Sequence, residues 1–281
     1  MFGCTRTDGR RFHEGIDLKP VRRDNQGEPL DPVFTVMAGR VLYANRTPWH
    51  SSYGRYVVIE HTGVSPSVIS LYAHLRSIDE AIIEGASVET GQQIGVMGRS
   101  AGGYTIPTWR AHVHFELGFW LSETFEDWYE WKEYETRNRH GLMSGLNIIG
   151  FDALDFYNKF RSREVRDFES YFRQQPVAYT LRVRSDVVPD FIERYSVFLE
   201  GDLPSAGLVG WEIDFAWFGL PIRWRPLSGK AASAGDRVEV VSFDADLVGA
   251  NTCRPTVQLR NGEPRIGAHT ERILQLLFGF R

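Results

Sequence analysis

Two segments in the first half of the chain follow the pattern of β-strands. Residues 68–73 form an apolar run with β-branched and aromatic side chains, bounded by polar residues, which predicts a strand. In residues 111–117, strand alternation places His112, His114 and Glu116 on one face and apolar side chains on the other. The polar face either points into a site or is solvated, and an isolated H-x-H motif does not decide between these alternatives.

The pattern changes in residues 119–140, which are rich in aromatic and charged side chains. Trp128, Trp131 and Tyr134 recur at helical spacing, which predicts a helix. Such an aromatic stripe usually covers an apolar face. The alternative is a wall of a binding groove, since aromatic rings are effective contact platforms. We expect residues 141–160 to close this first domain.

The remainder of the chain predicts a separate α+β module. Its alternating or apolar segments predict strands at 176–184, 211–218, 222–225 and 237–243, and helices at 189–199 and 271–278. Large apolar side chains share one face of the second strand, and such faces are more often core than binding surface. The expected organisation is therefore a mainly β domain at 1–160 and a smaller α+β module of unknown role at 161–281.

Composition and charge exclude several classes of protein. The 281 residues are 42% hydrophobic and 24% charged, which is ordinary for a globular protein. A net charge of -4 gives no electrostatic case for nucleic acid, and no apolar run is long enough to predict a transmembrane segment. Cys4 and Cys253 are compatible with one disulfide or two thiols. None of these features determines the oligomeric state.

Metal-ligand residue types gather in three short motifs. They are H-E-G-I-D with His13 and Asp17, Y-A-H-L with His74, and H-V-H-F-E with His112 and His114. Zinc held by imidazole nitrogens and a carboxylate keeps a position for water and lowers the pKa of that water to about 7. The three motifs together therefore indicate a zinc hydrolase site.

The H-E-G-I-D motif must turn sharply if both of its ligands are to reach one ion, and Gly15 permits such a turn. A helical alternative would make Glu14 a general base, as in a variant of H-E-x-x-H. Gly15 and Ile16 are poor helix formers. We therefore expect a loop or strand end here, with Glu14 exposed.

The order of these motifs resembles the lysostaphin-type (LytM-like) zinc metallopeptidases, which cut peptide bonds in bacterial peptidoglycan. Residues 53–61 are similar to the family's strand before Y-A-H-L, and residues 85–98 resemble its glycine-punctuated hairpin. The resemblance covers about residues 12–117. It implies an antiparallel β-sheet metallopeptidase core with loop and helix insertions.

Carried over to this chain, the resemblance implies that His13, Asp17 and His114 bind one Zn²⁺ ion. It implies that His112 is the general base, and that His74 orients the attacking water or stabilises the tetrahedral intermediate. The expected activity is a metalloendopeptidase acting on cross-links or stem peptides of peptidoglycan. The alternative is a catalytically silent peptidoglycan-binding or amidase-activating relative. Such relatives typically lack a ligand, and this chain lacks none.

Three further residues are candidate substrate contacts. Trp109 and Arg110 stand where the family usually has a small turn, and they either contact a stem peptide or serve as packing and a solvated charge. His50 lies in a loop that could border the groove, although a lone histidine is more often a surface residue. Residues 21–33, which are rich in charged and turn-forming residues, are predicted to form a surface loop near the site.

The resemblance also implies an extracytoplasmic location, with peptidoglycan or its peptides as the partner. No signal peptide is visible in the sequence. We therefore expect that an export segment has been removed or that the natural start lies upstream.

Overall fold

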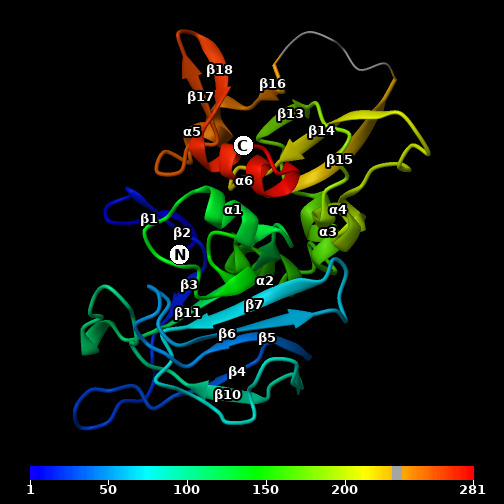
Figure 1. Cartoon of the computed structure of the whole chain (residues 1–281). Coiled ribbons are helices and arrows are strands. Elements are labelled where there is room, and N and C mark those ends of the chain that lie inside the picture. The colour runs from blue at the N-terminus through cyan, green and yellow to red at the C-terminus, as the bar shows by residue number, and fades with distance from the viewer. Residues whose placement is uncertain (230–235) are drawn as a thin grey trace. The chain divides into compact units, whose positions relative to one another are not determined.

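The computed structural model describes residues 1–229 and 236–281. They form two compact units: the first comprises residues 1–2, 14–120 and 136–155, and the second comprises residues 3–13, 121–135 and 156–281. The paired strands of both units are antiparallel, and the chain is mainly β as expected (Figure 1). The division into domains 1–160 and 161–281 stays a prediction.

The principal sheet of the first unit is antiparallel, with the strand order β12-β11-β7-β6-β5-β9 and with β3 paired to β11. In Figure 1 the strands β7, β6 and β5 run side by side. The strands are β3 (Ile16–Leu18), β5 (Gly39–Asn45), β6 (Tyr56–His61), β7 (Val68–Ala73), β9 (Ser87–Val88), β11 (Val113–Trp120) and β12 (Ile148–Phe151).

The predicted strands of this sheet are present. The segment 68–73 is β7, while β11 begins two residues later than expected and continues to Trp120. Every side chain of β11 is buried, on both faces. The polar face that carries His114 and Glu116 is therefore not a solvated surface. It packs inside the unit, where polar groups need partners.

A smaller sheet and two short 3₁₀ turns complete the first unit. The sheet has the order β4-β10-β8. Apolar side chains of β6 and β7 pack with residues near β11 and β12 to form the core, because removing apolar surface from water is favourable. The remaining elements are β4 (Pro32–Phe34), β8 (Ser77–Ile78), β10 (Gln93–Val96), η1 (Thr108–Arg110) and η2 (Gly141–Met143).

The second unit contains a four-stranded antiparallel sheet with the order β15-β14-β13-β16. Trp211, Ile213 and Phe215 on β14 are fully buried, which confirms that this strand face is core. The strands are β13 (Tyr179–Val183), β14 (Leu208–Phe215), β15 (Pro221–Ser228) and β16 (Val238–Phe243), and two hairpins add β1 (Gly3–Arg6), β2 (Arg11–His13), β17 (Val257–Arg260) and β18 (Glu263–Ile266).

Two helical segments of the second unit are shorter than the sequence pattern predicted, whereas the helix predicted at 271–278 begins three residues earlier, at Ala268. The only helix within residues 119–140 is α1 (Phe125–Trp131), which is followed by Glu133 with a positive φ of 51°. The predicted helix 189–199 divides at Tyr195, whose φ and ψ of -122° and 53° are not helical, into α4 (Asp190–Arg194) and η3 (Ser196–Phe198). The others are α2 (Ala153–Arg161), α3 (Phe168–Arg173), α5 (Ala245–Gly249) and α6 (Ala268–Phe278).

Cys4 and Cys253 form a disulfide with an S–S distance of 2.09 Å. Of the two states compatible with the sequence, the structure therefore has the oxidised one. Both cysteines belong to the second unit. Within residues 1–229 and 236–281, no helix has the length and apolar character needed to cross a bilayer.

Candidate metal centre

A turn at Gly15 brings the first motif against β11. Strand β2 ends at His13 and β3 begins at Ile16, so the segment is a turn between strand ends and not a helix. A Cβ atom on Gly15 would lie 2.1 Å from the carbonyl oxygen of Phe115. Only glycine lets the chain pass this close to β11. Glu14, which we expected to be exposed, is half-buried.

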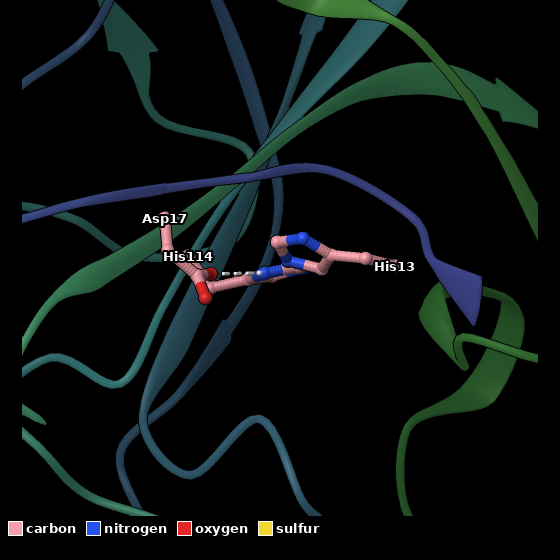
Figure 2. Close-up of side chains that lie close together, drawn as sticks. All are labelled: His13, Asp17 and His114. Carbon is pink, nitrogen blue, oxygen red and sulfur yellow. Dashed lines mark hydrogen bonds and ion pairs between the residues drawn. The ribbon is translucent and has the colours of Figure 1, made fainter. Parts of the chain in front are cut away.

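The register of β3 against β11 then places Asp17 directly opposite His114. His13 is separated from Asp17 by only three residues, so the chain keeps it near. Nitrogen and carboxylate atoms of His13, Asp17 and His114 lie within 4.8 Å of one another. Figure 2 shows the two imidazoles and the carboxylate pointing toward a common region. The three predicted ligands are thus brought together.

The cluster is buried except at its carboxylate. His13 and His114 are 2% and 4% exposed, whereas the Asp17 side chain is 33% exposed. Two imidazoles and one carboxylate are a donor set that suits zinc, with room for water on the solvent side. Arg6 donates a hydrogen bond of 2.7 Å to His13 Nε2. An ion bound at that nitrogen would take the place of the guanidinium.

Glu116 supports His114 from behind, and this role was not predicted from the sequence. His114 Nε2 lies 2.7 Å from Glu116 Oε1, which also accepts a 2.7 Å bond from the Tyr53 hydroxyl. The carboxylate can only accept, so it holds the proton on Nε2 and directs Nδ1 toward Asp17, 3.1 Å away. The available signal was alternation, which puts Glu116 on the face of His112 and His114.

Electrostatics at His114 favour a positive charge. Burial by itself would lower the pKa of His114, but the hydrogen bonds to Asp17 and Glu116 raise this pKa to about 9. The two carboxylates outweigh the cost of burial, because an opposite charge in contact stabilises the charged form. The same surroundings suit a bound cation.

His74 and His112 lie next to the ligand cluster. Their ring centroids are 4.8 Å apart, and the His74 ring is 6.0 Å from that of His114. His74 Nδ1 donates to the Ser100 carbonyl at 2.9 Å, and His112 Nδ1 donates to the Arg110 carbonyl at 2.7 Å. Since a carbonyl only accepts, Nδ1 of each ring carries a proton, and in the neutral form Nε2 is the acceptor. His112 Nε2 also lies 3.4 Å from Asp17 Oδ1.

His74 is held neutral and in an uncommon backbone conformation. Burial, and then the neighbouring His112, lowers the pKa of His74 to about 3. Its φ is +62°, in the left-handed region that few residues other than glycine adopt. Such strain persists where the surroundings hold it, often at functional sites. Here the His74 amide donates to the Tyr53 carbonyl at 2.9 Å.

Of the three candidate substrate contacts, Trp109 and Arg110 lie in the 3₁₀ turn η1, and His50 lies in a loop. Trp109 is 77% exposed, and the Arg110 guanidinium lies 5.8 Å from the centre of its ring. The His50 ring is 6.3 Å from that of His140. In the part of the chain that the structure describes, no hydrogen bond joins these three side chains to the ligand cluster. Their role in substrate binding stays a prediction.

An antiparallel β protein with a candidate metal centre is the class that the fold and site define. Residues 11–123 match the model of peptidase family M23. This match confirms the resemblance read from the motifs, over nearly the same segment. A comparison with curated proteins gives no match.

Solved structures of peptidases are similar to parts of the chain. A point mutant of the catalytic domain of the prophage-encoded M23 protein EnpA from Enterococcus faecalis is 24% identical over 41% of this chain and 75% of that chain, with a TM-score of 0.31. The catalytic domain of the antimicrobial peptidase lysostaphin from Staphylococcus simulans is 24% identical over 40% of this chain and 68% of that chain, with a TM-score of 0.28. A zinc-containing peptidase from Vibrio cholerae is 26% identical over 36% of this chain and 32% of that chain, with a TM-score of 0.25. The chain thus spans about a third of the last protein.

Proposed function

We propose that the protein is a zinc-dependent metalloendopeptidase that hydrolyses peptide bonds in peptidoglycan, in a cross-link or a stem peptide. One observation carries the proposal: His13, Asp17 and His114 converge within 4.8 Å, beside the histidines of the other two motifs. The M23 match over residues 11–123 supports the reaction class and the substrate class.

His13, Asp17 and His114 would hold one Zn²⁺ ion per chain. When bound, zinc supplies Lewis acidity, which polarises a peptide carbonyl and makes water a better nucleophile at neutral pH. The chain supplies the shape of the site. Buried imidazoles form its floor, and the partly exposed Asp17 leaves one side open to solvent.

His112 and His74 would handle the proton and the developing charge. In this proposal, His112 Nε2 takes the proton from the attacking water, because its Nδ1 is occupied as a donor to the Arg110 carbonyl. His74 orients that water and stabilises the negative charge that develops on the substrate oxygen. The proton then passes to the leaving amine.

The Cys4–Cys253 disulfide supports an extracytoplasmic location, because disulfides persist in oxidising compartments. That location agrees with peptidoglycan as the proposed substrate, which lies outside the cytoplasm. The location is part of the proposal and would be tested by fractionating cells that produce the protein.

The test combines metal content with product analysis. Wild-type protein is incubated with zinc and purified peptidoglycan, bound zinc is measured, and released muropeptides are identified by mass spectrometry. We expect one zinc per chain and new amino termini at one type of peptide bond. His114→Ala should lose zinc and activity together, whereas His112→Ala should keep zinc and lose about 10²–10⁴-fold in rate.

Arg40→Gln is the matched control, because Arg40 is an exposed residue of β5, three strands away from β11 in the sheet. It should retain zinc and activity. If His114→Ala keeps its zinc, the ligand assignment is wrong. If the zinc-loaded wild type releases no peptide from several wall types, the silent binding or amidase-activating alternative is favoured.

A further inference from the structure

A pocket of about 460 Å³ in the first unit is lined by three arginines. They come from different segments: Arg55 precedes β6, Arg76 follows β7, and Arg99 follows β10. One acidic side chain, Glu28, shares the pocket. None of these four residues belongs to the candidate metal centre.

The walls of the pocket are held by the Ser100 hydroxyl and by a close backbone approach at Gly54. Ser100 Oγ accepts a 2.9 Å hydrogen bond from the Arg55 amide and donates one of 2.8 Å to the Leu75 carbonyl. Gly54 has a φ of +65°, and a Cβ atom there would lie 2.1 Å from the Ser100 carbonyl oxygen. The segments that carry Arg55 and Arg76 are therefore fixed against the Ser100 loop.

The pocket carries a surplus of positive charge. Arg99 forms an ion pair with Glu28 at 2.7 Å, with further bonds from Nε to both carboxylate oxygens, so these two charges offset each other. Arg55 uses only Nε, which donates to the Arg46 carbonyl at 3.1 Å. Within the described residues, the Arg76 side chain has no hydrogen bond or ion pair. Two guanidinium groups thus remain available.

The pocket adjoins His74. Arg76 is two residues beyond His74 in the chain, and the Ser100 carbonyl, which belongs to the pocket wall, accepts the bond from His74 Nδ1. The pocket and His74 thus share Ser100, which lies on the Nδ1 side of the His74 ring.

We propose that Arg55 and Arg76 bind a carboxylate of the peptide substrate, on the His74 side of the scissile bond. The inference rests on the proposed function and narrows its substrate to peptides with a terminal or side-chain carboxylate close to the bond cleaved. Guanidinium groups suit this role because they bind carboxylates through paired, charge-assisted hydrogen bonds. A peptide cross-link made only of neutral residues would have no carboxylate to bind Arg55 and Arg76.

The experiment compares cross-linked stem peptides that differ only in one carboxyl group, free or amidated. The terminal and the side-chain carboxyl groups are amidated in separate peptides, which distinguishes the two sources. The assays are kcat and KM for cleavage, and calorimetric binding of analogues whose scissile amide is replaced by a CH₂–NH group.

For the wild type, amidation of the recognised carboxyl should raise KM and the dissociation constant at least about 10-fold, with kcat within about twofold. Arg55→Gln and Arg76→Gln should bind the free and amidated forms alike. Arg40→Gln should discriminate as the wild type does. Circular dichroism checks that each variant is folded.

The outcomes separate the two proposals. If the wild type cleaves every form with equal KM and binds the analogues equally, the pocket assignment is wrong and the peptidase function stands. If it discriminates in binding but cleaves none, the pocket assignment stands and the proposed catalysis fails. Full discrimination retained by folded Arg55→Gln and Arg76→Gln would also overturn the assignment.

Discussion

Replacing Glu116 with glutamine tests the support of His114. Glu116 is 1% exposed, and one of its oxygens lies 2.7 Å from both His114 Nε2 and the Tyr53 hydroxyl. Glutamine keeps the shape but removes the negative charge and presents an amide that can be oriented in two ways. The imidazole of His114 then becomes a weaker and less well oriented ligand.

Losing a carboxylate partner of a metal-binding histidine typically costs about 10- to 100-fold in metal affinity, or about 1.4 to 2.7 kcal/mol. The assay is competition for zinc with a chromophoric chelator. It should be run above pH 9, because Glu116 helps to raise the pKa of His114 to about 9. Below that pH, zinc must displace a proton that Glu116 also stabilises, so the two effects of the substitution partly cancel.

Tyr53→Phe should fall between the wild type and Glu116→Gln, because it removes one bond to Glu116 and leaves the carboxylate beside His114. Glu60→Gln, on β6 of the same sheet, is the control and should bind zinc as the wild type does. The reasoning is refuted if Glu116→Gln binds zinc within about twofold of the wild type under conditions in which His114→Ala does not bind.

Three further sets of substitutions test what stabilises the fold. Gly15→Ala places a Cβ atom 2.1 Å from a carbonyl oxygen of β11, so it should separate β3 from β11, lower the unfolding temperature and abolish zinc binding. The double variant Cys4→Ser/Cys253→Ser should destabilise the second unit by about 2–5 kcal/mol in calorimetry, because the bond closes a long loop. Burial lowers the pKa of His61 below its ordinary 6.5. Its contribution to the free energy of unfolding is therefore complete above pH 6.5. As the pH falls from 6.5 toward the lowered pKa, this contribution decreases by about 1.4 kcal/mol per pH unit.

For each of these predictions, one experimental result would contradict it. Gly63→Ala, where no atom lies within 4 Å of the added Cβ, should leave stability and zinc binding unchanged, and an equal effect at Gly15 and Gly63 would remove the close-approach argument. A double cysteine variant as stable as the wild type would show that the bond contributes little. Denaturant titrations of His61→Gln should have a flatter pH dependence, and an unchanged slope would exclude His61 as its source.

Residue types in three motifs indicated a metal site, and the family resemblance then selected His13, Asp17 and His114 as its ligands. The H-E-G-I-D turn, the strand at 68–73 and the polar face of β11 were all predicted, because the periodicity of side chains along one strand is a local property. Helix lengths were predicted less well. The aromatic stripe of residues 119–140 has helical spacing, but only Phe125–Trp131 is helical.

The partners across the sheet could not be predicted. His114 lies 97 residues from Asp17 in the sequence, and Glu116 lies 63 residues from Tyr53. The arginine pocket likewise joins segments after β7 and β10 with the turn before β6. No local propensity determines such contacts, since they depend on strand order and register.

The sequence by itself determined which side chains are able to bind a metal ion and accept a proton, because those properties belong to the residue types. Only the tertiary structure decided that Asp17 faces His114, that Glu116 and Tyr53 stand behind it, and that Cys4 meets Cys253. The physical reason is that hydrogen bonds and ligand contacts require distances of a few ångströms. Pairing of distant strands creates those distances, and the order of residues along the chain does not.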